Sequence, residues 1–281
     1  MSTSWQQWIG RKQLASDCIS KSPLLAMRST LEGILGCPEE QTVPPLWHWL
    51  YFLDKPPQTQ LAQDGHEKRG KYMPPITLPR RMWAASQLQF LLPLKVDDLV
   101  TRESVINSIE TKQGKSGALA FVTIDHKISA ESGLAIIEKQ TIVYRGQAAG
   151  KPARKKVTEK ADFEKTVNPT ILLLFRYSAL TFNAHRIHYD REYACNEEGY
   201  PGLVVHGPLL ATLLIGALQE NYPEGIIKNF EFRALKPVFD LTPFTICGQN
   251  PDQEGHVKLW ISDNEGDLCM QATAVLKKSE N

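Results

Sequence analysis

Residues 181–218 read TFNAHRIHYDREYACNEEGYPGLVVHGPLLATLLIGAL, and this stretch decides the expected fold. Its first part places polar side chains every two or three residues between apolar flanks, at Asn183, His185, Arg186, His188 and Asp190. Polar groups buried in such surroundings must be paired or must face a cavity. Its second part, 208–218, is an apolar run with proline in its first turn, which is typical of a buried helix. We therefore expect a polar site directly before a central helix.

Strands are expected on both sides of this stretch. Segments rich in Val, Ile, Thr and aromatic residues lie before it at 82–90, 99–110, 117–128 and 133–145. Similar segments follow it at 229–235, 244–249, 256–262 and 268–277. Roughly the first 50 residues read as helical, with a helix that starts at Ser22-Pro23 and stops before Gly36. Two halves, 1–150 and 151–281, thus each combine a helix with an antiparallel meander, joined by a linker at 146–156.

A loop-like segment, 55–81, is rich in proline and glycine, and its second half carries the basic residues Lys68, Arg69, Lys71, Arg80 and Arg81. A segment of this length without secondary structure is often functional or disordered. Its basic side chains fit a solvated face as well as a ligand site, and both interpretations stay open.

Composition excludes several classes of protein. The 32 Lys and Arg residues nearly balance 31 Asp and Glu, so the net charge of +1 gives no general attraction to nucleic acid or membranes. No run approaches the ~18 apolar residues of a spanning helix, and the N-terminus lacks a secretory signal, so a cytoplasmic location is expected. The 5 cysteines are scattered without a CxxC pair, which argues against disulfides or a zinc site.

Histidine suits reversible proton transfer because its pKa of ~6.5 lies near working pH. His185 and His188 share a face only if their segment is helical, and they would then be able to hold a metal. No third ligand stands at a characteristic spacing, so no metal is expected.

The window 181–190 resembles the hydratase signature of MaoC-like, (R)-specific enoyl-CoA hydratases and related 3-hydroxyacyl-thioester dehydratases, roughly D-x-N-P-x-H. Residues 183–188 occupy this pattern, and His206-Gly207-Pro208 matches the family's step into its central helix. Together with EGYPGLVVHGPL, the window further resembles the double hot-dog subgroup acting on mesaconyl-C4-CoA and itaconyl-CoA. The resemblance implies an α+β double hot-dog fold, with two antiparallel sheets each wrapped around a central helix. Residues 1–150 would be a degenerate half and 151–281 the catalytic half.

The resemblance assigns roles to individual residues. His188 corresponds to the catalytic histidine, and Gly207 to the glycine whose N–H polarises the thioester carbonyl. Such an N–H at a helix N-terminus is a free donor aimed at developing enolate charge. Asn183 stands where the family has a catalytic aspartate; its amide accepts no proton at neutral pH but can orient water. His188 is then the only strong acid or base of the signature, unless Asp190 or Glu198 folds back.

The signature's Asn-Pro step is His185-Arg186 here. A guanidinium suits a carboxylate, so we hypothesise that Arg186 or Arg176 binds the free carboxylate of a dicarboxylic acyl-CoA. His185 and His206 would complete the substrate-binding set. The alternative for Arg186 is a surface ion pair with Glu192 or Asp190.

We therefore expect a hydro-lyase that hydrates a short dicarboxylic enoyl-CoA, itaconyl-CoA or mesaconyl-C4-CoA, to citramalyl-CoA in itaconate degradation. The alternatives are a 3-hydroxyacyl-thioester dehydratase of fatty-acid type and a non-catalytic acyl-CoA-binding protein, because one fold hosts several chemistries. A thioesterase is disfavoured by the order of the motifs. The expected partner is the acyl-CoA substrate, without a cofactor beyond its coenzyme A and without nucleic acid or membrane. A homo-oligomer, with a homodimer favoured, is also expected.

Overall fold

The computed structural model describes residues 5–36, 41–114, 117–146 and 154–278. Its strands are β1 (Lys12–Cys18), β2 (Arg80–Phe90), β3 (Leu99–Gly114), β4 (Gly117–Ala130), β5 (Gly133–Arg145), β6 (Phe163–Val167), β7 (Gly225–Ala234), β8 (Phe244–Gly248), β9 (His256–Asp263) and β10 (Leu268–Lys278). Its α-helices are α1 (Lys21–Leu31), α2 (Ile171–Leu180) and α3 (Gly207–Asn221). The predicted linker falls mostly on 147–153, and with it the boundary at 150 lies outside the described residues.

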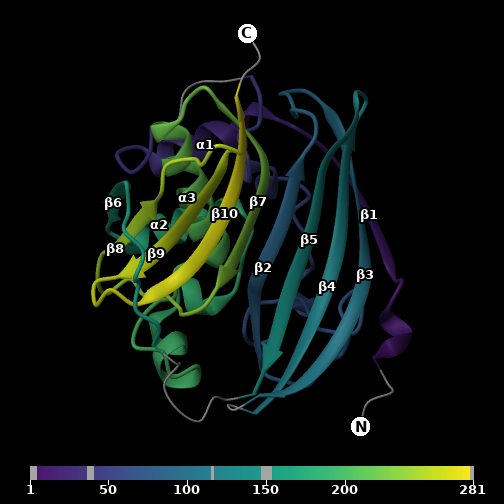
Figure 1. Ribbon diagram of the computed structural model, residues 1–281. Coiled ribbons are helices and arrows are strands. Elements are labelled where there is room, and N and C mark those ends of the chain that lie inside the picture. Colours follow the sequence, from purple (N-terminus) through teal and green to yellow (C-terminus); the bar gives the residue numbers. More distant parts are fainter. Residues whose placement is uncertain (1–4, 37–40, 115–116, 147–153, 279–281) are drawn as a thin grey trace.

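Within the described part of the chain, the strands form one antiparallel sheet in the order β1-β3-β4-β5-β2-β7-β10-β9-β8-β6. The eight strands expected from the sequence are all present, as β2 to β5 and β7 to β10. The two meanders meet where β2 pairs with β7, from Ala85 opposite Arg233 to Gln89 opposite Asn229. The two expected sheets are therefore joined edge to edge into one curved layer (Figure 1).

Alternation of side chains explains why these segments become strands. Along β4, Val122, Ile124, His126 and Ile128 are buried, and the residues that alternate with them are more accessible. Successive side chains of a strand point to opposite faces, so this pattern buries one face of the sheet. Gly133 turns β4 into β5 with φ of 121°, a conformation that glycine adopts without strain.

The expectation of a helical N-terminal stretch is wrong for residues 12–18. Strand β1 pairs with β3 there, and its side chains alternate between exposed and half-buried positions. Such an edge strand has weak hydrophobic periodicity, which is why its sequence, KQLASDC, did not predict it. Helix α1 begins one residue before the predicted Ser22, and α3 begins at Gly207, one residue before the predicted run.

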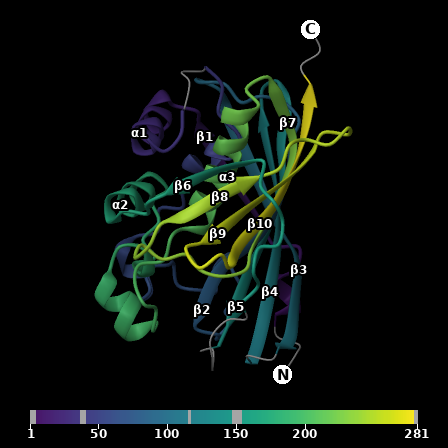
Figure 2. The ribbon, with the colours of Figure 1, turned by 60° about the vertical axis from the view of Figure 1, so that its left-hand side comes forward.

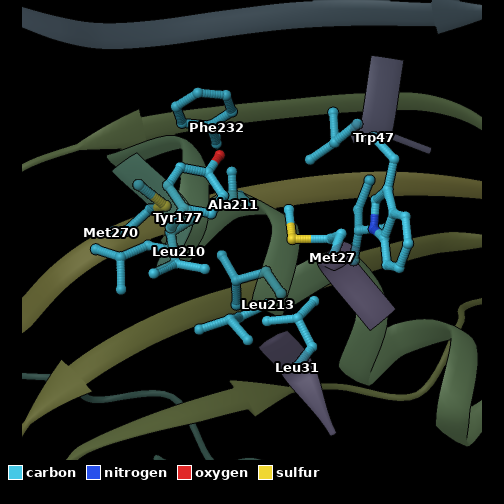
Figure 3. Close-up of a cluster of buried hydrophobic side chains, with 14 of the residues drawn as sticks. Met27, Leu31, Trp47, Tyr177, Leu210, Ala211, Leu213, Phe232 and Met270 are labelled. Atoms are coloured by element: carbon cyan, nitrogen blue, oxygen red, sulfur yellow. The ribbon is translucent and has the colours of Figure 1, made fainter. Parts of the chain in front are cut away.

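The helices gather on one side of the sheet (Figure 2). Helix α3 packs on β7 to β10 and on β2, and α1 packs against α2. Apolar residues cover nearly the whole circumference of α3, so burial on all sides suits it. Figure 3 shows side chains from both halves in one core: Met27, Leu31, Trp47, Tyr177, Leu210, Ala211, Leu213, Phe232 and Met270.

This core fixes the segment that carries the polar motif. The segment starts at the end of α2, and the chain returns at 203–206 to begin α3. Val204 donates its N–H to the Ile187 carbonyl (3.0 Å), and Val205 donates to the Val238 carbonyl (2.8 Å). The four described cysteines are free. None of the described helices has the length and apolarity that crossing a bilayer requires.

Candidate active site

A cavity of about 870 Å³ lies where the two halves meet. Four of the residues proposed from the sequence line it: Asn183, His185, His188 and Gly207. A pocket of this size suits a small-molecule ligand. Residues of the 55–81 segment line it as well, so both halves of the chain build the site.

His188 lies at the end of a short 3₁₀ turn, Arg186–His188, and is buried. Its Nδ1 lies 2.7 Å from the Val204 carbonyl oxygen, which only accepts, so Nδ1 carries the proton. The Nε2 lone pair makes no hydrogen bond with a described residue and is left for a ligand in the cavity. Burial lowers the pKa of His188 to about 4, so the ring is neutral at pH 7. A neutral imidazole with a free Nε2 is able to act as a base.

His206 supports His188 from behind. The two rings are stacked, with centroids 3.7 Å apart and an interplanar angle of 19°. The Nε2 of His206 lies 2.8 Å from the Ser178 hydroxyl, and burial holds its pKa well below the usual value. His206 is not among the described residues that line the cavity. Its position is therefore that of a packing partner of His188.

The N–H of Gly207 begins α3 and has no acceptor inside the helix. Gly207 lines the same cavity as His188. The helix dipole adds partial positive charge at this position. The arrangement thus offers a base and an anion-stabilising donor to one ligand.

Asn183 lines the cavity, but its side-chain oxygen already accepts a hydrogen bond. The His185 N–H donates to Asn183 Oδ1 at 3.0 Å, which closes a turn that follows Phe182 with φ of 49°. Asp190 and Glu198 are not among the described lining residues. Asp190 pairs with Arg186, and Glu198 pairs with Arg80 at 3.1 Å. Neither carboxylate folds back into the cavity.

The guanidinium groups proposed for a substrate carboxylate point elsewhere. Arg186 pairs with Asp190 at 2.8 Å and lies over the Tyr193 ring, so the alternative of an ion pair with Asp190 describes its contact. Arg176 is exposed and donates to the Ser29 carbonyl at 3.2 Å, which ties α2 to α1. Neither arginine is among the described residues lining the cavity.

A loop from the N-terminal half reaches the site; residues 58–67 are called the docking loop below. Its Asp64 carbonyl accepts the Arg186 N–H (3.0 Å), and its Gln63 carbonyl accepts from the Arg186 guanidinium (3.2 Å). At Gly65, with φ of 91°, a Cβ would stand 1.7 Å from the Ala184 carbonyl oxygen. Only glycine allows this approach.

The docking loop brings an aspartate and a histidine beside the signature. Asp64 accepts from His66 at Nδ1 (3.1 Å), and the His66 ring lies 4.2 Å from that of His185, between centroids. One ligand atom from each of Asp64, His66 and His185 lies within 4.8 Å of the others, a spacing at which a metal ion could be held. Sequence reasoning found no third ligand beside His185 and His188, because Asp64 and His66 are remote in the chain.

Arg81 is the exception among the five basic residues at 68–81. The other four are engaged: Lys68 with the Thr59 carbonyl, Arg69 with carbonyls at Ile76, Leu78 and Pro79, Lys71 with Gln60 and Glu67, and Arg80 with Glu198. Arg81 lines the cavity, and its guanidinium makes no hydrogen bond or ion pair with a described residue. Burial is the largest cause that lowers the pKa of His66 and of His185, and the charge of Arg81 is among the further causes.

Comparison with protein families assigns this arrangement to a known group. Residues 46–240 match the model of hydroxyacyl-thioester dehydratase type 2. The chain belongs to the hydroxyacyl-thioester dehydratase type 2 family. The matched range contains the docking loop, the signature and the start of α3, so the family covers the whole site. The expected class of enzyme, an acyl-thioester hydratase or dehydratase, is confirmed at the level of the family.

Two curated relatives are similar over most of their length. A mesaconyl-C(4)-CoA hydratase of Chloroflexus aurantiacus is 45% identical over 280 residues, covering 98% of this chain and 99% of that protein. A mitochondrial hydroxyacyl-thioester dehydratase type 2 of Schizosaccharomyces pombe is 33% identical, covering 84% of this chain and 89% of that protein. The resemblance stated from the signature is confirmed.

Solved structures confirm the fold. A MaoC-like dehydratase superposes with a TM-score of 0.73 at 13% identity, covering 98% of this chain and 100% of that one. A Mycobacterium tuberculosis protein described as having a double hotdog fold superposes with a TM-score of 0.59 at 12% identity, covering 96% of both chains. The expected α+β double hot-dog class is therefore correct.

Proposed function

We propose that this member of the family hydrates a short enoyl-CoA carrying a free carboxylate, mesaconyl-C4-CoA first and itaconyl-CoA second, to citramalyl-CoA. The observation that carries the proposal is the unpaired Arg81 guanidinium beside His66 and His185 in the cavity. A half-buried charge without a partner is costly unless a ligand pairs with it. The mesaconyl-C(4)-CoA hydratase relative supports the same substrate.

In the proposed reaction on mesaconyl-C4-CoA, His188 Nε2 accepts a proton from water while the water oxygen attacks the β-carbon. The electron pair of the double bond moves towards the thioester, whose carbonyl oxygen accepts a hydrogen bond from the Gly207 N–H. His188 then returns its proton to the α-carbon, so atoms and charge balance without a further cofactor. General base catalysis and stabilisation of the enolate oxygen each typically contribute ~10²-fold or more.

A carboxylate on the β-carbon fits this arrangement. In mesaconyl-C4-CoA the β-carbon carries a methyl group and the carboxylate, so a cation near the attacked carbon orients the double bond. Arg81 would supply that cation, while the pairing with Asp190 keeps Arg186 from doing so. Bidentate pairing of guanidinium and carboxylate would fix which face water attacks.

The test compares mesaconyl-C4-CoA with crotonyl-CoA, which lacks the carboxylate, in wild type, Arg81→Met and Arg186→Met. Loss of the charge-assisted pair should lower kcat/KM of Arg81→Met by roughly 10- to 150-fold on mesaconyl-C4-CoA alone. Arg186→Met should lower kcat/KM equally on both substrates, because the Arg186 guanidinium holds the docking loop. Equal loss on both substrates in Arg81→Met, or a wild type that prefers crotonyl-CoA, would instead favour the dehydratase of fatty-acid type.

A further inference from the structure

The signature of this chain has an amide, Asn183, where the resemblance places a catalytic aspartate. Water attacks along an oxygen lone pair, and it is oriented best when both of its hydrogens have acceptors. His188 Nε2 supplies one acceptor. The signature position of the second acceptor is Asn183, an uncharged amide whose side-chain oxygen already uses one of its two lone pairs for the His185 N–H.

The docking loop supplies an imidazole with the required tautomer. Asp64 holds His66 at two points: Oδ1 accepts the His66 backbone N–H at 3.0 Å, and Oδ2 faces the ring Nδ1 at 3.1 Å. Burial alone raises the pKa of Asp64, but the hydrogen bond from His66 outweighs it and keeps the carboxyl ionised. An ionised carboxylate only accepts, so Nδ1 carries the proton and Nε2 keeps its lone pair.

His66 and His188 both border His185 in the cavity, and after burial the charge of His66 is among the causes that lower the pKa of His188. Both rings contact His185, with centroid distances of 4.2 Å for His66 and 5.4 Å for His188, and all three rings line the cavity. One bridging water would require about 5 Å between the Nε2 atoms of His66 and His188. The Nε2 of His66 makes no hydrogen bond with any residue that the structure describes.

We propose that His66, held by Asp64, is the second acceptor for the reacting water and takes the place that the signature gives to an aspartate. The inference rests on the proposed hydration. One hydrogen atom of the water molecule points at His188 Nε2, and it leaves as the proton that ends on the α-carbon. The other hydrogen atom makes a hydrogen bond to His66 Nε2 and stays on the oxygen as the hydroxyl hydrogen of the product. The pair enters the site on the docking loop, whose placement depends on Gly65.

A metal ion is the competing occupant of Asp64, His66 and His185. Their ligand atoms lie within 4.8 Å of one another. The Asp64 carboxylate, however, already accepts the His66 backbone N–H at Oδ1 and faces the His66 Nδ1 with Oδ2. Metal content is therefore measured with the variants below.

The experiment measures kcat and KM on mesaconyl-C4-CoA, and on crotonyl-CoA, for wild type, His66→Ala, Asp64→Asn and His256→Gln. His256 is a matched control because Asp252 holds it in the same way, through its N–H (2.8 Å) and its Nδ1 (3.4 Å), on an exposed turn. His66→Ala should lower kcat roughly 10- to 100-fold with KM little changed. Asp64→Asn should be milder, because an amide oxygen still accepts from Nδ1. His256→Gln should behave as wild type.

Added imidazole provides a readout that a merely structural role would not change. Imidazole should restore a substantial part of kcat in His66→Ala and none in the control. A His66→Ala enzyme that keeps its kcat, or one that folds as wild type by circular dichroism but is not rescued, overturns the inference. The inference is also overturned if wild type holds one metal ion per chain and His66→Ala does not. A wild type that hydrates neither substrate overturns the proposed function itself, which separates the two failures.

Discussion

Replacing Gly65 by alanine tests how the docking loop and the signature are held together. The new Cβ would stand 1.7 Å from the Ala184 carbonyl oxygen, so the two backbones must separate by about 1.5 Å. The positive φ of 91° adds roughly 1–2 kcal/mol of strain. Losing the hydrogen bonds from Arg186 to Asp64 and Gln63 adds about 1 kcal/mol each. The free energy of unfolding should therefore fall by roughly 3–4 kcal/mol.

Activity should fall further than stability alone explains. A displacement of about 1 Å of a positioned group can cost ~100-fold in rate. The matched control is Gly70→Ala, which has a positive φ of 106° but no atom within 4 Å of the new Cβ. Gly70→Ala should therefore lose only roughly 1–2 kcal/mol from strain and keep its kcat. Urea unfolding and steady-state hydration rates measure both effects. If Gly65→Ala lost no more stability or activity than Gly70→Ala, the docking of this loop would not matter.

Two further predictions concern the signature and the core. Asn183→Ala should lower the free energy of unfolding by about 1 kcal/mol and reduce the hydration activity. Asn183→Asp still accepts the hydrogen bond from the His185 N–H, so it should keep most of the stability and most of the activity. If the two variants lost the same stability in thermal unfolding and the same activity in hydration assays, holding the turn would not be the role of Asn183. Burial raises the pKa of Glu138, but hydrogen bonds led by that from His48 outweigh it and lower the pKa from 4.5 to about 2. A lowered carboxyl pKa stabilises the fold above about pH 4.5, and this roughly 3 kcal/mol is lost as pH falls towards 2. Urea unfolding of Glu138→Gln should lack that part of the acid dependence, and an unchanged profile would contradict it.

The parts of the site that are local in sequence were predictable. His188 and Gly207 line one cavity because a signature turn and a helix start are determined by neighbouring residues, and their catalytic roles stay predictions. The contact of Arg186 was open between two partners, and the i,i+4 spacing to Asp190 is the one that the short turn favours. The role of His206 as a stacking partner depends on the tertiary path of 203–206 and had no local signal.

The parts of the site that come from the docking loop were not predictable. Gln63 and Arg186, which join the loop to the signature, are 123 residues apart in sequence. The one available signal was Asp64-Gly65-His66, a dipeptide typical of turns followed by histidine, inside a segment already recognised as long and rich in proline and glycine. Arg81 was noted only as one of five basic residues, and its lack of a partner needs the fold.

The fold followed the same division. The eight central strands were predicted because alternation and β-branched residues mark them. The missed strands, β1 and β6, lie at the two edges of the sheet, where every second residue is exposed and the pattern is weak. Helix α2 was noted only as an apolar flank, although Thr170 caps it through a hydrogen bond from the Leu173 N–H at 3.2 Å. Thr followed by an apolar run was an available start signal.

The central claim is that this chain adds water to an enoyl-CoA with His188 as the base. The most direct measurement incubates the protein with mesaconyl-C4-CoA in water labelled with heavy oxygen and analyses the intact thioester by mass spectrometry. Wild type should form citramalyl-CoA with one labelled hydroxyl and no free thiol, and His188→Ala should be slower by ~10²-fold or more. Release of free coenzyme A, or labelling by His188→Ala at the rate of wild type, would contradict the account.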